Sequence, residues 1–176
     1  MPALPIITVI GYSNAGKTRC VVGLISSLSR LGYRIASAKH CHQGFDLDVR
    51  GKDSWKHKEA GAVMTIMAGK NRIGIVSDAE PLVPLRQLAE RYVHHADLLL
   101  AEGYSWEPYP KILVVSRGTL EDERPHSPER LFALVADSGL ESALPQFTFD
   151  EMDQLALLIE QSLLRCQKEN GREGAA

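Results

Sequence analysis

The sequence predicts an α/β protein: a three-layer fold with a mostly parallel sheet and an antiparallel hairpin extension. Apolar runs typical of buried strands alternate along the chain with stretches of helical periodicity. A glycine-rich segment at residues 11–18 lies between the first apolar run and the first helical stretch. Two β-prone runs, 63–67 and 72–76, are separated by residues of the hairpin type, Ala-Gly-Lys-Asn.

Length and composition limit the class of protein. The 176 residues suffice for one well-buried domain, which we place at residues 1–168, with a disordered tail at 169–176. A hydrophobic content of 44% and a net charge of -2 are ordinary, so no nucleic-acid partner is expected. We predict no membrane span, because no apolar run reaches about 18 residues, and no signal peptide. The scattered cysteines, Cys20, Cys41 and Cys166, favour reduced thiols and a cytoplasmic location.

The glycine-rich segment fills every position of a phosphate-binding P-loop, the pattern of a P-loop nucleotide-binding fold. Its residues are Gly11, Tyr12, Ser13, Asn14, Ala15, Gly16, Lys17 and Thr18. Glycines there let backbone N–H groups surround an anion, and the positive end of the following helix points to the same place. We therefore expect Lys17 to reach the β- and γ-phosphates and the Thr18 hydroxyl to coordinate Mg²⁺.

The first half of the chain alternates strand and helix. The strand 6–10 is followed by an amphipathic helix at 19–31, which ends at Gly32. A second strand at 34–40, reached through that helix, indicates the crossover of a parallel sheet. Next come a polar, acidic loop, a short helix and the two hairpin strands, at 43–53, 52–60, 63–67 and 72–76.

The second half continues the alternation. A helix, three strands and a closing helix are predicted at 81–93, 97–103, 111–116, 131–136 and 152–167. The strand 97–103 is apolar on both faces, as expected for the interior of a parallel sheet. The charged, proline-containing segment 119–128 is expected to be a mobile loop.

Glu102 is the acidic candidate for the metal. It ends an apolar strand, and ligands of open α/β sheets bind at the carboxyl ends of strands. If this strand neighbours the first one, Glu102 lies beside the P-loop and holds Mg²⁺ directly or through water. The alternative is a structural carboxylate at a strand end.

Further candidates follow the second strand. Lys39 would add a positive charge on the nucleotide side. His40 and His42 share a face in an extended chain, which is compatible with a metal site, although contact with substrate or phosphate is the preferred interpretation. Asp46 and Asp48 also point the same way, so they would hold Mg²⁺ or position water, unless they belong to a solvated acidic loop.

These motifs together resemble the MobB family, the molybdopterin-guanine dinucleotide biosynthesis adaptor proteins. The resemblance extends from about residue 5 to about residue 165. Its motifs are the P-loop, the Lys-His-Cys-His run at 39–42, the aspartate pair, Gly-Lys-Asp-Ser at 51–54, Ala-Gly-Ala at 60–62 and the strand 97–103. It implies a homodimeric GTP-binding protein with weak GTPase activity that acts with the MobA guanylyltransferase when GMP is joined to molybdopterin.

The resemblance also implies roles for residues. The nucleotide phosphates and Mg²⁺ would be bound by Gly11, Gly16, Lys17 and Thr18. Glu102 would stand at the Walker B position, and Arg19, directly after the P-loop, is assigned to nucleotide binding as well. The Asn-Lys-x-Asp motif that reads guanine is absent, so GTP rather than ATP rests on the resemblance, and Asp137 is our candidate for the base edge.

Three functions compete. The first is a slow GTPase acting as an adaptor, with catalytic roles for Lys17, Glu102 and Asp46. The second is a P-loop small-molecule kinase, which an arginine-rich lid would support, but the segment 119–128 offers only Arg124, with Arg117 just before it. The third is a GTP-driven metallochaperone built around the two histidines of the 39–42 run.

Overall fold

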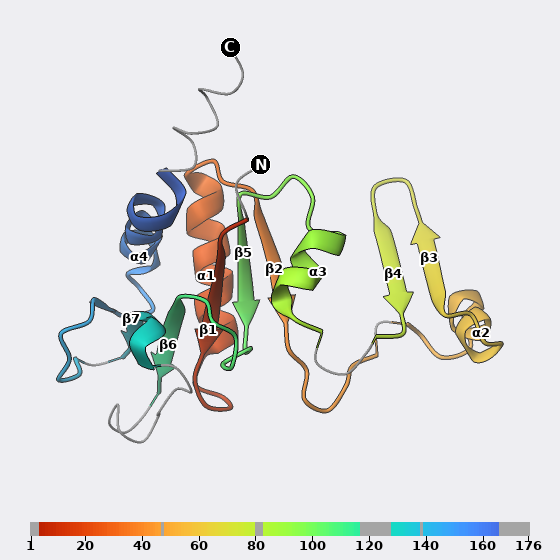
Figure 1. Cartoon of the computed structure of the whole chain (residues 1–176), viewed down its shortest axis with the longest axis horizontal. Helices are drawn as coiled ribbons and strands as arrows, with labels where there is room; N and C mark the ends of the chain where they lie inside the picture. Colours follow the sequence, from red (N-terminus) through yellow and green to blue (C-terminus); the bar gives the residue numbers. More distant parts are fainter. Residues whose placement is uncertain (1–3, 47, 80–82, 117–127, 138, 166–176) are drawn as a thin grey trace, which may run out of the picture. The chain divides into compact units, whose positions relative to one another are not determined.

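The computed structural model describes residues 4–46, 48–79, 83–116, 128–137 and 139–165 (Figure 1). Its contacts divide the chain into two compact units, Met1–His40 with Pro84–Ala176, and Cys41–Val83. The second unit is thus an insertion within the region that the sequence analysis treats as one domain. The predicted tail at 169–176 lies outside the described residues.

The first unit is built on a six-stranded sheet with the order β2-β5-β1-β6-β7-β8. Every pairing within it is parallel. Its strands are β1 (Ile6–Ile10), β2 (Ile35–Lys39), β5 (Leu98–Glu102), β6 (Lys111–Val115), β7 (Leu131–Ala136) and β8 (Gln146–Phe147). The strands predicted from apolar runs are confirmed, and β8 was not predicted.

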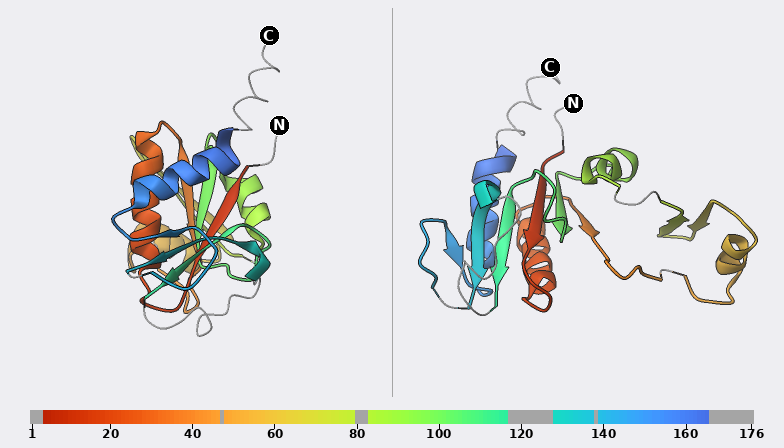
Figure 2. Two further views of the ribbon diagram at one scale, coloured as in Figure 1. Left: turned by 90° about the vertical axis from the view of Figure 1, so that its left-hand side faces the viewer. Right: turned by 60° about the horizontal axis from the view of Figure 1, so that its bottom comes forward.

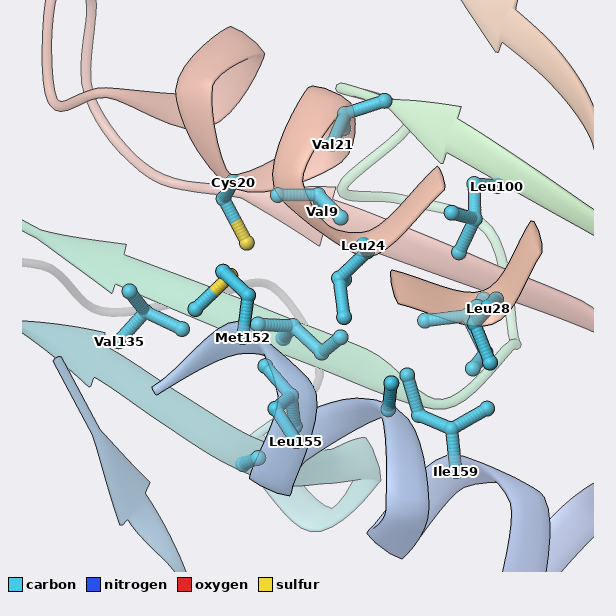
Figure 3. Packing of buried hydrophobic residues seen from close by; sticks show 14 of the residues in the cluster. Val9, Cys20, Val21, Leu24, Leu28, Leu100, Val135, Met152, Leu155 and Ile159 are labelled. Carbon is cyan, nitrogen blue, oxygen red and sulfur yellow. The ribbon is translucent and has the colours of Figure 1, made fainter. Parts of the chain in front are cut away.

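Helices cover both faces of this sheet (Figure 2). Alternate strand residues such as Val9 and Leu100 pack against α1 (Lys17–Arg30) and α4 (Met152–Ile159) on one face. Figure 3 shows side chains of the two helices meeting over the strands. On the other face, Leu99 and Ala101 pack against α3 (Leu85–Tyr92). The mostly parallel, three-layer fold is therefore confirmed.

The first helix begins at Lys17, directly after Gly16, so the last residues of the P-loop already form its first turn. Other helix ends differ from the prediction, since the helix predicted at 81–93 begins only at Leu85. The closing helix changes at Glu160 to a π-helical turn, Glu160–Leu164, which the apolar pattern does not distinguish from an α-helix. A short 3₁₀ turn, Pro128–Arg130, precedes β7. None of the helices in the described ranges is long and apolar enough to cross a membrane.

The second unit contains α2 (Asp53–Glu59) and the antiparallel pair β3 (Met64–Ala68) and β4 (Ile73–Ser77). The predicted hairpin is confirmed. Lys58 of α2 donates hydrogen bonds to the Ala62 carbonyl, 2.6 Å, and to the Asp78 carboxylate, 2.7 Å. These contacts join the helix to the residues that border the hairpin.

Candidate functional site

Two glycines shape the P-loop. Gly11 has φ +141°, and a Cβ there would lie 2.4 Å from the Val114 carbonyl oxygen. Gly16 has φ +98°, and a Cβ there would lie 2.6 Å from Cζ of Phe149. Asn14 also adopts the left-handed conformation, at φ 62°. A side chain at either glycine is excluded both by the backbone angle and by a neighbour, which is why the pattern requires glycine.

Lys17 lies inside the curve of the loop. Its Nζ donates hydrogen bonds to the carbonyl oxygens of Gly11, 3.0 Å, and Tyr12, 2.5 Å. Ala15 is buried, whereas Ser13 and Asn14 are exposed at the tip. The ammonium group and the first turn of α1 are thereby held at the same end of β1, as phosphate binding by a P-loop requires.

Glu102 lies beside the P-loop, as the sequence analysis expects if its strand neighbours the first. Strand β5 pairs directly with β1, and Val9 is opposite Glu102. The Thr18 hydroxyl oxygen lies 2.9 Å and 3.0 Å from the two carboxylate oxygens of Glu102, to which it donates its hydrogen bond. The structure therefore brings together the two predicted magnesium ligands, Thr18 and Glu102.

Lys39 reaches the same carboxylate. It is opposite Glu102 in the β2–β5 register, and its Nζ lies 3.2 Å from Oε1 of that residue. The Glu102 side chain is 11% exposed and that of Lys39 is 57% exposed. A carboxylate withdrawn from water requires compensation, which a hydroxyl and an ammonium group provide here.

His40 packs in an aromatic cluster next to Lys39. Its ring centroid lies 5.4 Å from that of Tyr104 and 4.8 Å from that of Trp106, with the rings steeply inclined. The backbone N–H of His40 donates to the Glu102 carbonyl, 3.0 Å. Sequence reasoning missed the two aromatic partners, and the signal that could have found them is their position directly after the strand that ends at Glu102.

A second group of neighbours was also missed. The Arg19 guanidinium lies over the Phe149 ring, 4.4 Å from its centroid, and 3.7 Å from the Asp150 carboxylate. Phe149 also adjoins Gly16. Hydrogen bonds from the backbone and the hydroxyl of Thr148 fix the next turn and lower the pKa of Glu151. The segment before α4 therefore lies against the P-loop, although nothing in its sequence pattern indicates this.

The contacts described above do not include the remaining predicted residues. Asp137 directly follows β7 and is exposed, and β7 is separated from β1 by β6. His42 and Asp46 are exposed and belong to the second unit. Their roles stay predictions. In that unit Asp48 accepts hydrogen bonds from the Ser54 hydroxyl and the Val49 backbone, both 2.8 Å, so its observed contacts organise the loop before α2.

The two alternative functions depend on other residues. Arg117 and Arg124, on which a kinase lid would depend, lie outside the described residues. Among the residues that are described, no three histidine, cysteine, aspartate or glutamate side chains are grouped to hold a metal ion.

Comparisons with known proteins match nearly the whole chain. A sequence model of the family MobB, molybdopterin guanine dinucleotide synthesis protein B, matches residues 6–137. The molybdopterin-guanine dinucleotide biosynthesis adapter protein of Haemophilus influenzae is 34% identical, covering 89% of this chain and 88% of its own length. The protein of the same name from Escherichia coli is 30% identical, covering 96% of this chain and 97% of its own length.

Solved structures agree with this match. The crystal structure of Bacillus subtilis MobB superimposes with a TM-score of 0.71 at 25% identity and covers 90% of this chain and 98% of that one. The P-loop geometry, the sequence match and the structural likeness lead to the same assignment. The chain belongs to the MobB family of molybdopterin guanine dinucleotide synthesis proteins.

Proposed function

We propose that this protein binds GTP with Mg²⁺ at its P-loop, hydrolyses it slowly, and acts in the cytoplasm as an adaptor to a MobA-like guanylyltransferase. Its place in molybdopterin guanine dinucleotide biosynthesis follows from the family. The observation that carries the nucleotide proposal is the contact of Thr18 with Glu102 beside the P-loop lysine. The preference for GTP over ATP rests on the family resemblance.

The residues at this site fit a magnesium ion. Mg²⁺ prefers oxygen ligands, and the Thr18 hydroxyl and Glu102 carboxylate already lie within hydrogen-bonding distance of each other. When bound, the ion would supply positive charge to the β- and γ-phosphate oxygens. Lys17 would neutralise phosphate charge from inside the loop, and the N–H groups that begin α1 would bind the phosphate oxygens.

We expect hydrolysis to be slow, because the sequence shows no obvious arginine finger or water-positioning glutamine. An arginine finger raises P-loop GTPase rates by about 10³ to 10⁵. Arg19, the guanidinium next to the loop, lies over Phe149 and near Asp150 instead. A second subunit or a partner enzyme would therefore complete the site.

A binding titration tests the proposal. Lys17→Ala should weaken binding of magnesium-GTP tenfold or more, equivalent to about 1.4 kcal/mol, because the ammonium group would no longer offset phosphate charge. Arg86→Ala is the control, since Arg86 pairs with Glu90 on the exposed surface of α3. Parallel titrations with ATP and a molybdopterin-containing fraction determine selectivity. Unchanged GTP affinity in a folded Lys17→Ala variant contradicts the proposal.

A further inference from the structure

The ion pair between Lys39 and Glu102 involves the carboxylate that we assign to magnesium. The two residues are direct partners in the parallel pairing of β2 and β5, so their side chains project from the same face of the sheet. Lys39 Nζ lies 3.2 Å from Glu102 Oε1, and the Thr18 hydroxyl donates to the same carboxylate. An ammonium group thus neutralises the proposed metal ligand.

The two partners differ in their freedom to move. The Glu102 side chain is 11% exposed and is held from β1 and α1 as well as from β2. The Lys39 side chain is 57% exposed and carries its charge on a flexible stem at the end of its strand. Lys39 can therefore leave the pair by rotating side-chain bonds, without any change to the sheet.

A divalent cation at Thr18 and Glu102 would be destabilised by this pair. The ion would place a double positive charge within a few ångströms of the ammonium group, in surroundings that screen less than water. A triphosphate changes the balance, because it brings negative oxygens to the same end of the sheet and offers the lysine a new partner.

We propose that Lys39 and Mg²⁺ compete for Glu102, and that Lys39 moves to the phosphate oxygens when the metal arrives with a triphosphate. The inference rests on the proposed nucleotide site and deepens it. Lys39 thus weakens binding of the metal alone, and it no longer opposes the metal once the lysine has moved to the phosphate oxygens.

The test measures metal binding without nucleotide. Mn²⁺ is the probe, and free Mn²⁺ is followed by electron paramagnetic resonance on protein stripped of nucleotide and metal. Lys39→Gln removes the charge yet keeps a hydrogen-bond donor for Glu102, and Lys39→Met removes both. Each should bind Mn²⁺ about fivefold more tightly than the unaltered chain, the upper end of what a partly exposed ion pair contributes.

Three further variants control the result. Lys39→Arg keeps the charge and should bind Mn²⁺ as weakly as the unaltered chain. Arg86→Met removes a cation from an exposed ion pair on α3, and its Mn²⁺ affinity should not change. In the double variant with Lys39→Gln and Glu102→Gln, the increase in Mn²⁺ affinity should disappear, because Mn²⁺ is expected to bind to the Glu102 carboxylate.

An unchanged or weaker Mn²⁺ affinity in folded Lys39→Gln overturns the competition, and so does the absence of Mn²⁺ binding in every variant. This failure is distinguishable from failure of the proposed function. If the chain binds magnesium-GTP through Lys17 but Lys39→Gln shows no gain, the inference alone is wrong. If the chain binds no GTP while Lys39→Gln gains Mn²⁺, nucleotide binding is wrong and the competition for Glu102 stands.

Discussion

Single residues explain why the P-loop pattern is so informative. Gly11 and Gly16 each combine a positive φ angle with a neighbouring atom that lies too close for a Cβ. Glycine at these two positions therefore has a steric cause, and the glycines can be recognised in the sequence alone. The neighbours themselves, Val114 and Phe149, are distant in sequence and could not be predicted. The same holds for Trp106 against His40, since ring contacts between loops leave no periodic signal.

Gly11→Ala should destabilise the fold by about 1–3 kcal/mol, the range for a residue forced into a sparsely populated backbone conformation. The added methyl group would also meet the Val114 carbonyl oxygen. Urea denaturation measures the change in the free energy of unfolding. Gly139→Ala is the matched control, because a Cβ at Gly139 meets nothing within 4 Å, and it should change stability by only a few tenths of a kcal/mol. Equal effects of the two substitutions would refute the steric account.

Cys20 should resist alkylation in the folded protein. Burial raises the pKa of its thiol to about 12, so at pH 8 the reactive thiolate is almost absent. Cys41 is partly exposed. In a Cys166→Ser background, iodoacetamide at pH 8 should modify Cys41, and mass spectrometry should find Cys20 modified only after denaturation. Labelling of both cysteines at similar rates in the folded chain would show that Cys20 is accessible.

Strands could be predicted from the sequence where burial on both faces gives a run of apolar residues. Strands β1, β5 and β6 are buried along their whole length, so each reads as a mainly apolar run, although Thr8 lies within β1, Glu102 ends β5 and Lys111 begins β6. Such runs do not reveal the order of the strands in the sheet. The position of Glu102 beside the P-loop could therefore be predicted only on the assumption that β5 neighbours β1. With two residues, β8 is too short to produce a periodicity.

The hairpin of the second unit has two unlike faces. Thr65 points to the covered face and is 7% exposed, whereas the other face carries Ile66, 62% exposed, and its cross-strand partner Ile75, 42% exposed. Met64, Ala68 and Ile73 lie on the same exposed face. An apolar sheet face of this kind is typical of protein–protein contacts. If the chain forms the homodimer that the family resemblance implies, we expect this face to be the subunit contact.

Ile66→Lys with Ile75→Lys should therefore convert a dimer into a monomer. The two charges would have to be buried without partners in the contact, while α2 and the covered face of the hairpin are untouched. Sedimentation equilibrium determines the mass in solution. Ile66→Val with Ile75→Val keeps the face apolar and should leave the mass unchanged. A charged variant that stays dimeric would assign the subunit contact to another surface.

The proposed nucleotide site of the first unit combines the P-loop with the Thr18 hydroxyl, the Glu102 carboxylate and two lysines. Intrinsic GTP hydrolysis should accordingly be slow, below about 1 per second, the low end of ordinary enzyme rates. Steady-state release of phosphate by the purified protein alone measures this rate, and a Lys17→Ala preparation corrects for contaminating phosphatases. A corrected rate well above that value would favour the kinase-like function over the adaptor.

The parallel pairing around β1 has a consequence for synthesis of the chain. Strand β1 is made first, yet both strands that hydrogen-bond to it, β5 and β6, follow the entire second unit. Pairing between strands so far apart in sequence slows folding, because the entropy cost of closing a long loop arises before the strand contacts can stabilise it. The apolar or β-branched residues of β1, Ile6–Ile10, therefore remain without their neighbouring strands while the chain emerges from the ribosome. The proposed nucleotide site is likewise completed late, because its carboxylate reaches the P-loop only after Glu102 has been made.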